Sequence, residues 1–109
     1  MTDFSRIYNL INLKKFEEAK ILIKNYTIKL PEDLNLQNIL GVTYLLENKN
    51  KDAIKILNKI IKIDPYYKDA IINLANIYIA EKKYLFSIFF LKRAISLDNK
   101  NEKLNYQLC

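Results

Sequence analysis

The chain matches itself when its sequence is shifted by 34 residues. Apolar residues then fall on apolar residues, and small residues fall on small ones. The matched sets are Pro31 with Pro65; Ala19 with Ala53 and Ser87; Ile23 with Leu57 and Leu91; Leu10 with Tyr44 and Tyr78; and Tyr26 with Ile60 and Ala94. A period in the range of about 20–50 residues indicates repeats, each too small to bury its apolar face without a neighbour. Three such repeats fill nearly all of the 109 residues.

The spacing of apolar residues within each repeat is helical. Phe16, Ala19, Ile23 and Tyr26 recur at steps of three and four, which places them on one face of a helix. One glycine and two prolines are too few for the many tight turns of an all-β domain. Breaks are expected at residues 14–15, 30–31, 48–50, 64–65, 82–83 and 98–101. The sequence therefore predicts six helices and a short C-terminal segment in a single all-α domain.

These residues resemble the tetratricopeptide-repeat (TPR) family. The second repeat has Leu40, Gly41, Tyr44, Ala53, Leu57, Ile60 and Pro65 at the family's spacing. The third repeat has Asn99 in place of the proline, and the first has Arg6–Ile7 in place of the large–small pair. The resemblance implies a right-handed α-solenoid of three helix-turn-helix repeats, over residues 1–33, 34–67 and 68–101. Residues 102–109 are expected to form a capping helix or part of a fourth repeat.

The composition argues against catalysis and against a cofactor or metal site. The chain has no histidine, and its one cysteine is Cys109. A cysteine nucleophile needs a nearby base, and no histidine can supply one. No glycine-rich phosphate loop is present. Cys109 falls in register with Gly41 and Ala75, which indicates a small core residue. We therefore expect a chain that is not an enzyme.

The resemblance to TPR proteins implies a protein-interaction scaffold or adaptor. In that family the first helix of each pair lines a concave groove, which would bind a peptide or a partner segment. The residues expected to line it here are Tyr8, Asn38, Val42, Asp69, Ile72, Asn73 and Asn76. Asparagine amides both donate and accept hydrogen bonds, so they can pair with the backbone of an extended peptide. The alternative is that these asparagines only reflect an asparagine-rich composition.

One kind of TPR partner is disfavoured. TPR domains that bind the acidic tails of heat-shock chaperones use lysine, arginine and asparagine at five groove positions. The matching positions here are Phe4, Tyr8, Ile39, Asp69 and Asn73. None of these residues is a cation, and Asp69 would repel a carboxylate. Chaperone tails are therefore not the expected ligand.

The second helix of the third repeat departs from the repeat pattern. Leu85, Phe86 and Phe89 occupy positions that are charged in earlier repeats, where Glu17, Glu18 and Lys55 stand. A helix that is apolar on nearly all sides is expected to be buried on nearly all sides. These three residues are therefore predicted to form a surface for a partner or for a second copy of the chain. A local patch covered by the C-terminal segment is the alternative.

The charge and hydropathy of the chain argue against two further classes of partner, nucleic acids and membranes. The net charge is +6, but the basic residues, among them Lys55, Lys59 and Lys62, are interspersed with acidic residues as on a solvated face, which disfavours nucleic acid. These acidic residues are Glu17, Glu18, Asp52 and Asp69. No apolar run approaches the ~20 residues needed to cross a bilayer, and no signal peptide is visible. A cytoplasmic protein is expected. The alternative function is an N-terminal docking or regulatory segment of a larger enzyme.

Overall fold

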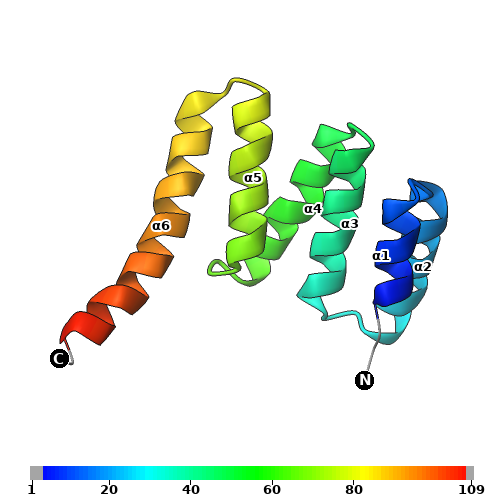
Figure 1. Ribbon diagram of the computed structural model, residues 1–109, viewed down its shortest axis with the longest axis horizontal. Helices are drawn as coiled ribbons and strands as arrows, with labels where there is room; N and C mark the ends of the chain where they lie inside the picture. Colours follow the sequence, from blue (N-terminus) through cyan, green and yellow to red (C-terminus); the bar gives the residue numbers. More distant parts are fainter. Residues whose placement is uncertain (1–3, 108–109) are drawn as a thin grey trace. The chain divides into compact units, whose positions relative to one another are not determined.

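A computed structural model describes residues 4–107 of the chain, and the side chains of residues 4–97. Within residues 4–107 the chain is all-α and has no strand (Figure 1). The helices are α1 (Ser5–Asn12), α2 (Phe16–Lys29), α3 (Leu34–Leu46), α4 (Asn50–Ile63), α5 (Lys68–Ala80) and α6 (Tyr84–Gln107). The first five predicted breaks fall between these helices, so the expectation of six helices is confirmed for the described residues.

The chain packs as two compact units. The first, Met1–Ile56, contains α1, α2, α3 and the start of α4. The second, Leu57–Cys109, contains the rest of α4 with α5 and α6. Each unit has its own buried apolar residues, as expected where the helices of a repeat protein pack on their neighbours along the chain.

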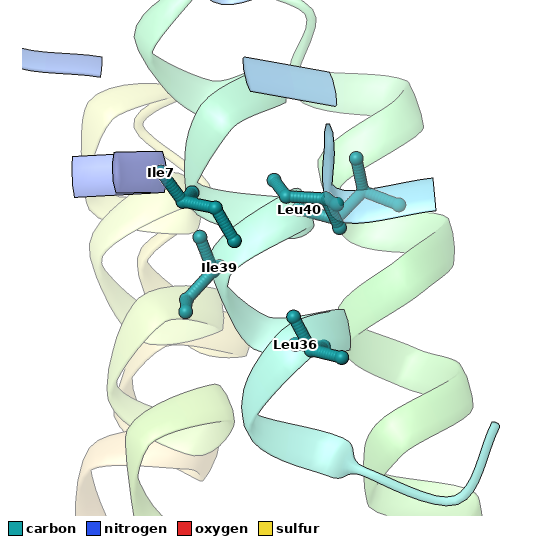
Figure 2. Packing of buried hydrophobic residues seen from close by; sticks show 5 residues of the cluster. Ile7, Leu36, Ile39 and Leu40 are labelled. Carbon is teal, nitrogen blue, oxygen red and sulfur yellow. The ribbon is translucent and has the colours of Figure 1, made fainter. Parts of the chain in front are cut away.

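The core of the first unit joins α1, α2 and α3. Five buried residues form one cluster: Ile7, Ile23, Leu36, Ile39 and Leu40. Figure 2 shows the four labelled members, Ile7, Leu36, Ile39 and Leu40, close together. Half-buried apolar residues, among them Phe4 and Tyr26, pack around this cluster, with the two rings 6.0 Å apart. Fully burying one such aliphatic side chain stabilises the fold by about 1.5–3 kcal/mol. The apolar stripe predicted along the second helix therefore faces this core.

In the second unit α5 and α6 lie side by side as a hairpin (Figure 1). The buried residues of α5 are Ala70, Ile71, Leu74, Ala75 and Ile77, and those of α6 are Ser87 and Ala94. Small side chains allow two helices to approach closely, which accounts for the small residues that recur in the repeat. Arg93 of α6 donates a hydrogen bond from Nη2 to the carbonyl oxygen of Pro65, at 2.7 Å.

The three turns within the repeats have the same backbone geometry. Lys14, Asn48 and Lys82, which are 34 residues apart, have φ values of 61°, 62° and 61°. In each turn the next residue donates its N–H to a carbonyl five residues earlier, as in Lys15 to Leu10 at 2.8 Å and Lys83 to Tyr78 at 2.8 Å. This is the Schellman arrangement, in which glycine usually takes the left-handed position. Here two lysines and one asparagine occupy that position.

Each of the two turns between repeats contains a proline, which comes after Leu30 in the first turn and after Asp64 in the second. Pro31 and Pro65 stand where the preceding helix has ended, which suits a residue without an N–H. Asp33 caps α3 by accepting the Leu36 N–H on its carboxylate at 3.2 Å. Asp64 instead accepts the Tyr66 N–H at 3.0 Å. Aspartate thus stabilises both turns, in one case as a helix cap and in the other as a local turn.

The end of the chain differs from the prediction. A break was expected at residues 98–101, followed by a separate helix over residues 102–109. Instead α6 continues without interruption from Tyr84 to Gln107. The physical reason is that Asn99 replaces the proline that ends the equivalent helices, so the backbone hydrogen bonds need not stop there. Cys109 lies outside the described residues, and the repeat boundaries stay a prediction.

Candidate functional site

In the second unit, α5 has one buried side and one exposed side. Its buried residues face α6 or the core, whereas Asp69 and Asn76 are exposed and Ile72 and Asn73 are half-buried. The spacing of these four residues, at i, i+3, i+4 and i+7, places them in one stripe. The stripe combines a carboxylate, two amides and an apolar side chain. It can therefore offer backbone hydrogen bonds and one apolar contact to a ligand.

In the first unit the predicted groove residues are less accessible. Tyr8 follows the fully buried Ile7 and is itself 47% exposed. Val42 is half-buried on α3, whereas Asn38 is only 8% exposed. Six of the thirteen residues of α3 are buried and only two are exposed, so this helix offers less free surface than α5 does. Among the predicted groove residues of this unit, Tyr8 is the most exposed.

The predicted surface of the third repeat is exposed on α6. Leu85, Phe86 and Phe89 are 84%, 57% and 59% exposed. Aromatic neighbours hold two of them: the Phe86 ring lies 5.3 Å from that of Tyr78, and the Phe89 ring lies edge-on to Phe90 at 5.1 Å. Tyr78 also stacks on Phe90 at 5.8 Å. The surface therefore rests on an ordered aromatic cluster.

The structure also contains a buried ion pair that the sequence did not predict. Lys20 of α2 is 6% exposed, and its Nζ lies 2.8 Å from a carboxylate oxygen of Glu17 and 2.8 Å from one of Glu47. The same ammonium lies 4.9 Å from the centre of the Tyr44 ring. Lys49 approaches the other oxygen of Glu47 at 3.8 Å. This network links the first repeat to the turn of the second.

The charges in this network influence each other's protonation. Burial alone would lower the pKa of the Lys20 ammonium, but its contacts with Glu17 and Glu47 outweigh burial and raise that pKa above its ordinary value. The hydrogen bond from Lys20 lowers the pKa of the Glu17 carboxyl. Lys20 therefore stays charged throughout the ordinary pH range.

One signal in the sequence could have revealed this network. Lys20 occupies the position held by Ile54 and Ile88 in the other two repeats. A charged residue in an otherwise apolar column needs a buried partner of opposite charge. Glu47 supplies it from the turn before α4.

Across the residues that the structure describes, no group of acidic, cysteine or histidine side chains is arranged to hold a metal ion. Over the same part of the chain, no helix is both long enough and apolar enough to cross a membrane.

Comparison with known proteins supports the reading of the repeats. No curated protein matches the chain. A protein-family model for the tetratricopeptide repeat matches residues 34–67 and 69–101. These two matches cover more than half of the chain, and they fall on helix pairs with the turn geometry described above. TPR repeats generally mediate protein–protein interaction and are typically non-catalytic. The 34-residue period, the paired helices and this match together show that the chain belongs to the tetratricopeptide-repeat family.

Proposed function

We propose that the chain binds an extended segment of a partner protein along the first helices of its repeats and catalyses no reaction itself. The observation that carries this proposal is the exposed stripe of α5. Asp69, Ile72, Asn73 and Asn76 lie together on the side of the helix opposite to its buried residues. Asparagine amides can pair with the backbone of an extended peptide, and Ile72 beside them can contact an apolar side chain of the partner.

Tyr8 and Val42 of the first unit contribute further contacts in this proposal. A half-exposed tyrosine offers a rigid ring for an apolar side chain of the partner. Asn38 contributes least, because only 8% of it is exposed. Asp69 favours a partner segment that carries a cation near this end of α5 and disfavours an acidic one.

The test uses a peptide selected from a random-peptide display library on the full chain. Replacing Asn73 and Asn76 together by Ala should weaken binding of that peptide by roughly 1–3 kcal/mol, because two backbone hydrogen bonds are lost. Titration calorimetry measures the change. Asn58→Ala, at an exposed position on α4, is the matched control and should leave affinity unchanged. Unchanged affinity in a folded Asn73→Ala/Asn76→Ala variant would remove the α5 stripe from the site.

A second contact surface in this proposal is formed by Leu85, Phe86 and Phe89. Contiguous exposed apolar area of this kind is uncommon in a monomer and marks a surface that another protein or a second copy covers. Its position on α6 separates it from the stripe on α5, so binding a partner segment need not compete with it.

A further inference from the structure

The outward face of α6 consists of Leu85, Ile88, Phe89, Lys92 and Ile95. These residues are spaced at i, i+3, i+4, i+7 and i+10, so they form one stripe along the helix. The four apolar members are 84%, 46%, 59% and 56% exposed in this order, and Lys92 is exposed as well. Phe86 lies at the border of the stripe, with its ring against Tyr78.

The composition of α6 is that of a covered helix. Three positions of α6 hold Ile88, Leu91 and Ile95. The positions 34 residues earlier, on α4, hold the same residue types: Ile54, Leu57 and Ile61. On α4 the leucine is fully buried and both isoleucines are half-buried. The face of α6 is apolar and open.

We propose that a second copy of this chain covers the outward face of α6, so that two α6 helices pack against each other about a two-fold axis. This rests on the second contact surface proposed above and deepens it, because it names the occupant, the face and the symmetry of the contact. Tyr84 and Phe86, 56% and 57% exposed, flank the stripe. Together these side chains would bury about 600 Å² on each copy, near the ~1,200 Å² total of the smallest stable interfaces.

The charges on α6 favour an antiparallel pair. In a parallel pair about a two-fold axis, Lys92 would lie against Lys92 of the other copy, and like charges in contact are unfavourable. In an antiparallel pair centred between Leu85 and Ile95, Lys92 lies opposite Ile88 instead. Its long aliphatic stem can then cover apolar surface while the ammonium stays in water.

Head-to-tail stacking of copies is disfavoured by the residues of α1. In α3, Leu40 and Thr43 are buried where the helix packs in its unit. The equivalent residues of α1 are Arg6 and Asn9, and both are exposed. A helix with these polar residues is a poor cover for the apolar face of α6, whereas a second α6 is a good one.

The first experiment measures self-association of the full chain by sedimentation equilibrium up to millimolar concentration. The unsubstituted chain should dimerise, and Leu85→Glu should raise the dissociation constant by at least about a hundredfold, since a charge would be buried in the interface. The control is Ile21→Glu, because Ile21 is the equivalent of Phe89 in the first repeat and is 59% exposed. It should leave the dissociation constant unchanged. A chain that stays monomeric at millimolar concentration overturns the proposal, as does an equal response to the two variants.

The second experiment tests the antiparallel geometry by disulfide cross-linking. Leu85→Cys and Ile95→Cys are each made in a Cys109→Ser background and oxidised alone or mixed. The mixture should give mainly the heterodimeric disulfide, because Leu85 lies opposite Ile95 in an antiparallel pair. Efficient Leu85→Cys homodimers would overturn that arrangement. Neither experiment reads peptide binding at Asn73 and Asn76, so failure of this inference and failure of the α5 site are distinguishable.

Discussion

The second helices of the first and third repeats have the same register but present different surfaces. On α2 the positions equivalent to Leu85 and Phe86 are Glu17 and Glu18, which are exposed and acidic. The position equivalent to Ile88 is Lys20, which is buried in an ion pair. The turns that precede these helices have nearly identical φ values, 61° at both Lys14 and Lys82. The same repeat backbone can therefore carry different side chains at its outer positions. We expect contacts with particular partners to depend on those side chains.

The largest expected effect tests the ion pair of the first repeat. Lys20→Ala should lower the free energy of unfolding by roughly 3 kcal/mol, because it leaves the largely buried Glu47 carboxylate without its closest cation. Ile88→Ala, at the equivalent position in the third repeat, should cost roughly 1 kcal/mol, since Ile88 is 46% exposed. Urea denaturation at dilute protein concentration measures both.

A rescue variant separates charge from packing at Lys20. The double variant Lys20→Met/Glu47→Gln removes both buried charges while keeping similar volume, so it should recover most of the lost stability. The companion variant Lys20→Ala/Glu47→Gln removes the charges without restoring the stem; if it is no more stable than Lys20→Ala while Lys20→Met/Glu47→Gln is, packing of the lysine stem rather than charge pairing explains the loss.

The next largest effect is expected from placing the aromatic residues of the α6 surface, Phe86 and Phe89, at the equivalent positions of the first repeat. Glu18→Phe with Ile21→Phe places aromatic residues at the positions of Phe86 and Phe89 while leaving Glu17 paired with Lys20. The variant should form species larger than the dimer in sedimentation velocity runs, since exposed contiguous apolar area promotes association. Glu18→Gln with Ile21→Gln is the control. A transferred surface without effect would mean that the aromatic cluster around Tyr78 is required as well.

The smallest expected effect concerns the turn geometry that all three repeats share. Lys14→Gly and Lys82→Gly should each raise the free energy of unfolding by about 1 kcal/mol, because glycine adopts positive φ without the steric cost of a Cβ. Asn48→Gly should raise it less, since asparagine tolerates the left-handed conformation better than lysine does. Thermal unfolding followed by circular dichroism ranks the three variants. Destabilisation by Lys82→Gly would show that contacts of the lysine side chain outweigh the backbone cost.

Sequence reasoning predicted the repeated part of the fold well, because the 34-residue period fixes apolar faces and turns together. It was wrong at residue 98 and beyond, where Asn99 allows α6 to continue although polar residues cluster there. It missed Lys20, since a lysine on a helix is usually solvated and only tertiary packing brings Glu47 to it. It also gave Asn38 the same weight as Asn76, although one is buried and the other exposed. Such differences depend on neighbouring helices, which a periodic pattern does not specify.

The repeated turns also have a consequence for how the chain reaches its folded state. The hydrogen bonds that close each turn join residues at most five positions apart, at Lys15, Lys49 and Lys83. Joining such near neighbours costs little chain entropy, so each of the three hairpins is an equally short-range starting point. Proteins dominated by contacts of this range fold in microseconds to milliseconds. We therefore expect parallel routes that begin at any of the three turns, with fast collapse and no obligatory first repeat.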